Sequence, residues 1–240
     1  MQEIGFIKAI YRYPVKSMAG ERLAEAALGW HGIEGDRRFA FMRTKETGGF
    51  PWLIGSRFPG LLRYQPISQN AAEPTHIVTP DENILELRSE VLREEISAAY
   101  KSPVALFQLN HGIFDEAMIS LINVATIDEI GRMSGSDLDP RRFRPNILLE
   151  TNGTTAAAFE EDKWVGKIIA FGKENDGPSM SVMQRDARCA MINFDPDTAV
   201  STPQILKTVV RSNQNNAGIY GSTLRSGLIS EGDPVFLIEV

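Results

Sequence analysis

The segment HIVTPDENILEL, residues 76–87, indicates the fold class most directly. In His76–Thr79 and in Ile84–Leu87, polar and apolar residues are interleaved, which is typical of a strand with one buried face. The four residues between them, Pro80-Asp81-Glu82-Asn83, are of types that favour turns. The segment therefore predicts an antiparallel hairpin.

Similar β-rich runs extend from this hairpin toward both ends of the chain. The 20 glycines and 13 prolines fall between the runs, where turns are needed. This rhythm predicts a mainly β protein with a few helices (α+β), a barrel or a sandwich, rather than repeated strand–helix units. The expected strands are Ile4–Tyr11, Arg38–Met42, Val104–Leu109, Asn146–Leu149, Trp164–Phe171, Ser181–Met183, Ala190–Phe194 and Pro234–Glu239.

Helical patterns are fewer. The best predicted helix is Ala117–Met133, which has isoleucines at helical spacing and two acidic residues ahead of it. A second is predicted over Pro203–Arg211 with Thr202 as its N-cap, and a third over Ser89–Ala99. The expected domain boundary lies near His111, which divides the chain into residues 1–110 and 111–240.

Composition excludes several classes of protein. The 240 residues carry a formal net charge of −6, which disfavours non-specific nucleic-acid binding. No stretch reaches the roughly 18 apolar residues of a membrane helix, and the N-terminus lacks a secretory pattern. The single cysteine rules out an intrachain disulfide and a zinc or iron–sulfur site built from several thiolates. We therefore expect a cytoplasmic protein that binds neither nucleic acid nor membranes.

Three features could carry chemistry. The first is YPVKS, residues 13–17, where a strand end leaves Lys16 and Ser17 on a loop suited to holding a phosphate. The second is a set of arginine-rich islands, because guanidinium groups hold phosphate or carboxylate oxygens with paired hydrogen bonds. The densest island is DPRRFRPN, residues 139–146, in which Pro145 is expected to hold Arg144 extended and Asn146 offers an amide to a heterocycle. An ordinary turn and a solvated charge run remain the alternatives.

The third feature is Cys189, in the segment RDARCA, residues 185–190. A thiolate is a strong nucleophile and a soft metal ligand, and the neighbouring arginines favour its charged form. Most lone cysteines are small buried hydrophobic residues, which is the alternative here. The flanking charges argue against full burial of this one.

Seven segments in order resemble proteins with a molybdenum cofactor sulfurase C-terminal (MOSC) domain. More narrowly, they resemble the branch with an extra N-terminal β-barrel, which includes the mitochondrial amidoxime-reducing component and its bacterial relatives. The resemblance covers essentially the whole chain. The segments are YPVKSMAGE (13–21), GDRRF (35–39), ISLIN (119–123), RFRPN (142–146), FEEDKW (159–164), RCAMINFDPDT (188–198) and EGDPVFL (231–237).

This resemblance implies an N-terminal β-barrel-like domain over residues 1–110 and a MOSC β-barrel domain over residues 111–240. It also implies a molybdenum–pyranopterin cofactor between them, with Cys189 as the metal ligand and catalytic residue, whereas pyridoxal phosphate is not expected. The segment before the cysteine, residues 184–187, departs from the usual pattern of the family. The cofactor-binding residues that the resemblance and the basic islands suggest are Lys16, Ser17, Arg37, Arg57, Arg144, Asn146 and Arg188.

The activity that the resemblance implies is the reduction of N-hydroxylated compounds, in which two electrons and two protons remove the hydroxyl oxygen as water. No further cysteines are present to hold an iron–sulfur cluster, so the electrons are expected to come from a separate protein. Two alternatives stay open. The chain could bind or carry the pterin cofactor without turnover, or Cys189 could carry sulfur as a persulfide.

Overall fold

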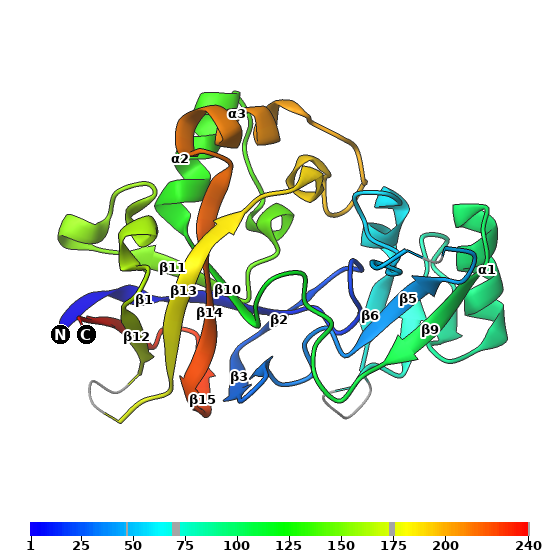
Figure 1. Ribbon diagram of the computed structural model, residues 1–240, viewed down its shortest axis with the longest axis horizontal. Helices are drawn as coiled ribbons and strands as arrows, with labels where there is room; N and C mark the ends of the chain where they lie inside the picture. Colours follow the sequence, from blue (N-terminus) through cyan, green and yellow to red (C-terminus); the bar gives the residue numbers. More distant parts are fainter. Residues whose placement is uncertain (47, 69–72, 173–175, 240) are drawn as a thin grey trace.

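The structure is a computed structural model that describes residues 1–46, 48–68, 73–172 and 176–239. Most of its ordered elements are strands (Figure 1), as predicted. Within these ranges there are three α-helices, none of which is long and apolar enough to cross a membrane. The helices are α1 (Glu90–Tyr100), α2 (Val124–Ser134) and α3 (Gln204–Asn213).

Seven strands form a closed barrel. The strands follow the order β11-β10-β14-β13-β12-β16-β1 across the sheet. Strand β1 pairs with its neighbour β16 and also with β11, the strand at the other end of this order, so the sheet closes on itself. The main hydrophobic core of the protein lies inside this barrel. The strands are β1 (Gln2–Arg12), β10 (Ile119–Asn123), β11 (Ile147–Thr151), β12 (Ile168–Phe171), β13 (Ser179–Ala187), β14 (Asn216–Arg225) and β16 (Pro234–Ile238).

Gly5 permits the closure of the barrel. It is paired with Thr151 of β11 and with Val235 of β16, and its φ is +152°. A Cβ atom at this position would lie 2.0 Å from the carbonyl oxygen of Glu150, closer than non-bonded atoms can approach. Only glycine therefore allows β1 to lie against both neighbours at this point.

The remaining strands form smaller sheets. The predicted hairpin is confirmed, because Ile77 pairs with Leu85 in antiparallel register. Strand β5 pairs with β9 beside it, and α1 packs there over a second hydrophobic core (Figure 1). The strands are β2 (Glu21–Leu23), β3 (Glu25–Gly29), β4 (Gly32–Ile33), β5 (Phe39–Arg43), β6 (Gln65–Ile67), β7 (His76–Val78), β8 (Ile84–Glu86), β9 (Val104–Gln108) and β15 (Gly227–Ser230).

Several predicted elements need correction. The predicted helix Ala117–Met133 is wrong in its first half, because residues 119–123 are strand β10 and α2 begins only at Val124. All five residues of β10 are buried, so the strand lacks the alternation that would have marked it. The predicted strand Ala190–Phe194 is a 3₁₀ turn over Ala190–Asn193. Trp164 lies in another 3₁₀ turn before β12.

The other two helices were predicted closely. Helix α1 begins after Ser89, whose hydroxyl accepts a hydrogen bond from the backbone N–H of Leu92 at 3.2 Å. Helix α3 begins after Pro203, so the prediction that Thr202 caps it with its side chain is wrong. The carbonyl of Thr202 instead accepts a hydrogen bond from Ile205 N–H.

N-terminal strands take part in the same sheets as C-terminal ones. Strand β1 belongs to the barrel, and β3 pairs with β15 through residues such as Ala27 and Leu228. The domain boundary near His111 stays a prediction. The chain crosses from one half to the other at the loop that precedes β10 (Figure 1).

A buried carboxylate, Asp36, ties three loops together. It is 1% exposed and accepts hydrogen bonds from the backbone N–H of Tyr13 at 2.7 Å and from Asn146 Nδ2 at 3.0 Å. The Arg37 guanidinium is its ion-pair partner. The loops that carry YPVKS, GDRRF and RFRPN therefore meet at one carboxyl group.

The variant Asp36→Asn should lower the free energy of unfolding by about 3–5 kcal/mol, since it leaves Arg37 buried without its counter-charge. Urea denaturation measures this. Asp137→Asn, on the exposed turn after α2, is the control and should stay within about 0.5 kcal/mol of the unmodified chain. An equal effect of both substitutions would contradict the role given to Asp36.

A second buried carboxyl group, Glu161, fastens a 3₁₀ turn to the start of α2. It is 0% exposed and accepts hydrogen bonds from Asn123 N–H at 3.3 Å and from Thr126 Oγ1 at 2.9 Å. Burial raises the pKa of Glu161 to about 7, although these hydrogen bonds act in the opposite direction. The folded chain therefore holds a proton that the unfolded chain releases near its ordinary pKa of 4.5.

Because the folded state binds this proton more tightly, Glu161 should cost stability as the pH rises from about 4.5 through 7, by about 3 kcal/mol in all. In Glu161→Gln this loss should be absent. Urea denaturation at several pH values compares the two chains, with Glu94→Gln on exposed α1 as a control for the change in net charge. Parallel pH profiles for the unmodified chain and Glu161→Gln would refute the prediction.

Candidate functional site

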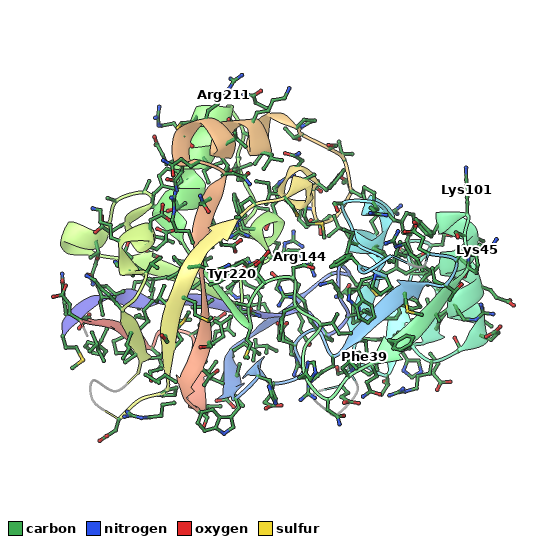
Figure 2. The ribbon with its side chains drawn as sticks, in the orientation of Figure 1. Phe39, Lys45, Lys101, Arg144, Arg211 and Tyr220 are labelled. Atoms are coloured by element: carbon green, nitrogen blue, oxygen red, sulfur yellow. The ribbon has the colours of Figure 1, made fainter. Side chains whose placement is uncertain are left out.

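One pocket of about 270 Å³ lies where the barrel meets the N-terminal loops. Figure 2 shows two of its residues, Arg144 and Tyr220, near the centre of the molecule. Seven of the eight predicted site residues line it: Lys16, Ser17, Arg37, Arg144, Asn146, Arg188 and Cys189. The chain thus brings together segments that lie up to 173 positions apart, from position 16 to position 189.

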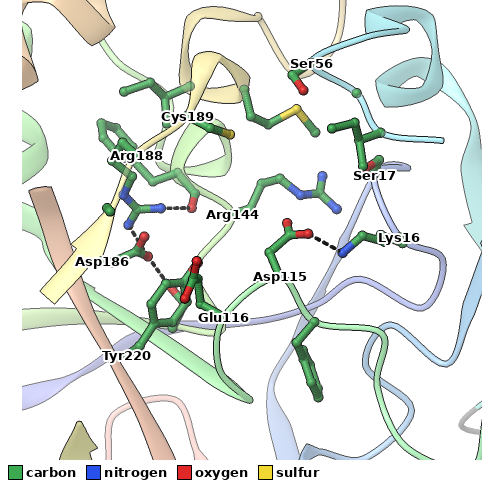
Figure 3. Close-up of a pocket in the computed structure, with 18 of the residues that line it drawn as sticks. Lys16, Ser17, Ser56, Asp115, Glu116, Arg144, Asp186, Arg188, Cys189 and Tyr220 are labelled. Atoms are coloured by element: carbon green, nitrogen blue, oxygen red, sulfur yellow. Dashed lines mark hydrogen bonds and ion pairs between the residues drawn. The ribbon is translucent and has the colours of Figure 1, made fainter. Parts of the chain in front are cut away.

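Lys16 lies at one side of the pocket (Figure 3). Its side chain is 4% exposed, and Nζ donates hydrogen bonds to the carbonyl of Ile113 and to Asp115 Oδ1, both at 2.8 Å. Burial lowers the pKa of the Lys16 ammonium, and Asp115 opposes this shift. The carboxylate of Asp115 is 60% exposed, so solvent reaches only one side of the ion pair.

Arg144 projects between the two sides of the pocket (Figure 3). Its Nη1 donates to the carbonyl of Met18 at 2.8 Å, and its guanidinium stacks over Tyr13 with 4.2 Å between Cζ and the ring centroid. Burial lowers the pKa of Arg144 to about 10, and the nearby Arg37 acts in the same direction. Arg144 therefore stays charged at neutral pH, and its buried Nη2 has no hydrogen-bond partner among the described residues.

The backbone at three of the predicted residues is left-handed. The φ angles are 66° at Ser17, 51° at Arg37 and 51° at Arg144. The prediction that Pro145 holds Arg144 extended is therefore wrong, because Arg144 ends the 3₁₀ turn Pro140–Phe143 as its left-handed C-cap. Such a backbone costs a non-glycine residue roughly 1–2 kcal/mol, and three of the described residues that adopt it line the pocket.

Two of the predicted residues are already engaged within the protein. The Asn146 amide donates to Asp36 and to the carbonyl of Tyr11, and it accepts from Ser120 N–H. The Arg188 guanidinium donates hydrogen bonds to the carbonyls of Ala217 and Phe143 and forms an ion pair with the carboxylate of Asp186. Both side chains line the pocket, but most of their hydrogen bonds hold its walls in place.

Cys189 is exposed and lies at the upper rim of the pocket in Figure 3. It follows the last residue of β13 by two positions and has an extended backbone, with φ −104° and ψ 179°, immediately before a 3₁₀ turn. The expectation that this thiol is not fully buried is confirmed. Met191, two residues on, also lines the pocket and packs against Gly55.

Arg57 does not line the pocket. Its side chain is 53% exposed, and its guanidinium lies 3.5 Å from the carboxylate of Glu46. The neighbouring residues Ile54, Gly55 and Ser56 form that side of the pocket instead.

Sequence reasoning missed the polar group opposite Lys16. Asp186 is 1% exposed, and its Oδ2 accepts from Ser120 Oγ at 3.0 Å and lies 2.7 Å from Arg188 Nη2. Burial raises the pKa of Asp186 to about 6, while Arg188, Ser120 and Tyr220 lower it. Burial raises the pKa of the Tyr220 hydroxyl as well. The only signal in the sequence was an acidic residue between the arginines ahead of Cys189.

Two family models match the chain. The model described as the MOSC domain matches residues 108–236, and the model described as the MOSC N-terminal beta barrel domain matches residues 4–110. No curated protein matches the chain significantly.

One of the solved structures shares the fold of the whole chain. The YuaD protein from Bacillus subtilis is 14% identical and superposes with a TM-score of 0.54 over 99% of this chain and 97% of that chain. YiiM from Geobacillus stearothermophilus is 20% identical, with a TM-score of 0.39 over 51% of this chain and 55% of that chain. The two family matches together extend from residue 4 to residue 236. The chain therefore belongs to the MOSC-domain family, in the form that carries the N-terminal β-barrel domain.

Proposed function

We propose that this pocket binds a molybdenum–pyranopterin cofactor and that the protein reduces N-hydroxylated compounds with electrons from a separate protein. MOSC domains are associated with binding of the molybdenum cofactor. One observation carries the proposal further: an exposed thiol, Cys189, shares a pocket with Arg144, a cation that has no acidic partner among the described residues.

The charges of the pocket fit an anionic group. Four of its cations already have an acidic partner within 4 Å: Lys16 with Asp115, Arg37 with Asp36, Arg142 with Asp195, and Arg188 with Asp186. Arg144 has none among the described ion pairs, and its Nη2 lacks a hydrogen-bond acceptor. A buried guanidinium nitrogen without an acceptor is costly, so an anion bound beside Arg144 Nη2 would gain a strong charge-assisted hydrogen bond.

The donor set also fits the metal end of the cofactor. Molybdenum is a metal that accepts soft thiolate ligands, and Cys189 is the one cysteine of the chain. Its sulfur would hold the metal, while Arg144, Lys16 and Ser17 would hold the phosphate. When bound, the cofactor supplies two-electron oxygen-atom transfer. Arg144 would orient the cofactor. The ring of Tyr13 and the carbonyl of Met18 hold the Arg144 side chain in place.

Metal content tests the assignment of Cys189. The full chain, produced in a host that makes the molybdenum cofactor, should contain about one molybdenum per chain by elemental analysis. Cys189→Ala should lose most of it, because the thiolate ligand is gone, while its thermal unfolding midpoint should stay close to that of the unmodified chain produced without the cofactor. A metal-free chain whose mass exceeds the sequence mass by one sulfur atom, about 32 Da, and returns to it on reduction would instead identify Cys189 as a persulfide carrier.

Loss of one guanidinium tests the anion site. Arg144→Lys keeps the charge but loses the planar fork and its stacking on Tyr13, so cofactor content after purification should fall at least about fivefold. Arg57→Lys is the matched control, because Arg57 lies outside the pocket lining, and it should leave the content unchanged. Equal losses in the two variants would show that Arg144 has no special part in holding the cofactor.

The loaded protein should also reduce benzamidoxime to benzamidine when a reduced dye supplies the electrons. Stable cofactor binding with no turnover under any donor would favour the role of a carrier.

A further inference from the structure

The pocket has two chemically opposite sides (Figure 3). On one side lie the ammonium of Lys16 and the hydroxyl of Ser17, and on the other lie the carboxyl of Asp186 and the hydroxyl of Tyr220. Arg144 lies between them. Lys16 and Asp186 each have an internal ion-pair partner, Asp115 and Arg188 respectively, so the atoms left for a ligand are those that lack a partner.

The acidic side carries its own unpartnered atom. Oδ2 of Asp186 accepts a hydrogen bond from Ser120 and pairs with Arg188, but the buried Oδ1 has no hydrogen-bond partner among the described residues. The Tyr220 hydroxyl lies close enough to lower the pKa of Asp186, but it forms no hydrogen bond of good geometry with Oδ1. A buried acceptor without a hydrogen bond destabilises the folded protein by about 1–3 kcal/mol relative to one that is hydrogen-bonded. The residue is 1% exposed, so water does not solvate it freely. The pocket thus holds an unmatched donor, Arg144 Nη2, and an unmatched acceptor, Asp186 Oδ1.

We propose that Asp186 is a recognition residue for the amino group of a 2-amino-4-oxo heterocycle such as a pterin, whose exocyclic N–H donates to Oδ1. The inference rests on the proposed function, since it assigns the pterin end of that cofactor to this side of the pocket. Because Oδ1 lies beneath the surface of the pocket, the pocket side chains must shift slightly when the ligand binds.

The neighbours of Asp186 determine whether a donor or an acceptor of the ligand can lie against its free oxygen. Arg188 carries only donors and points one of them at Oδ2, so that oxygen is fixed as an acceptor for the protein. Oδ1 is left as an acceptor for the ligand. An ionised carboxylate attracts an N–H and repels a carbonyl oxygen, so the position next to it distinguishes an amino group from an oxo group.

Two matched ligands test this without any metal. The full chain, purified from a host that makes no molybdenum cofactor, is titrated calorimetrically with pterin-6-carboxylate and with lumazine-6-carboxylate. The two share the anionic arm and differ at position 2, where lumazine has a carbonyl in place of the amino group, and at the adjacent N1, which carries a hydrogen in lumazine. The unmodified chain should bind the pterin at least about tenfold more tightly.

The variant Asp186→Asn should reverse this preference. Its amide oxygen must face Arg188, which leaves the NH₂ group at the position of Oδ1, where it donates to the lumazine carbonyl. Glu116→Gln, which removes a different acidic residue from the lining of the same pocket, is the control and should keep the pterin preference.

Equal affinities of the unmodified chain for the two ligands, or no binding of either, would overturn the proposal. So would an unchanged preference in Asp186→Asn. If Asp186→Asn fails to fold, the affinities of the unmodified chain for the two ligands still test the proposal. Molybdenum in the loaded protein together with equal affinities would reject the role of Asp186 and leave the proposed function standing.

Discussion

The hydrogen bonds of Asp36 hold the pocket together. A carboxylate that is almost wholly removed from water must have its charge matched, and here the matching groups come from three loops: the backbone of Tyr13, the guanidinium of Arg37 and the amide of Asn146. The same loops carry Lys16, Ser17 and Arg144 into the pocket. The need to satisfy one buried acid therefore fixes where the cationic side chains lie.

Neutralisation of charge then shapes what the pocket can bind. The chain is acidic overall, and most cations of the pocket are paired with carboxylates of the protein. Arg144 is held differently, by the face of Tyr13 and the carbonyl of Met18, and both leave its positive charge uncompensated. Strained, left-handed backbone at Ser17, Arg37 and Arg144 accompanies this arrangement. Such strain persists where the surrounding structure fixes the conformation, as the hydrogen bonds of Asp36 do here.

Local patterns in the sequence predicted most of the strands and brought Lys16, Arg144 and Cys189 to attention, because turns, arginine islands and a lone thiol are readable within a few residues. Strand β10 was mistaken for helix because all of its residues are buried. Strand β14 was missed because its glycines and polar residues resemble a loop. Asp186 was missed because its place in the pocket depends on a contact with Ser120, which lies 66 positions away in the sequence. Contacts of that kind depend on how the barrel closes, which no local pattern expresses.

The closure of the barrel has a consequence for how the protein is made. Strand β1 leaves the ribosome well before its barrel neighbours β11 and β16, which begin at residues 147 and 234. Pairings so distant along the chain give the barrel a high contact order and slow its formation. The small core around β5, β9 and α1 is complete by residue 108, where β9 ends, and can condense during translation. The edges of β1 that β11 and β16 will cover stay open to misassembly until each of those strands emerges.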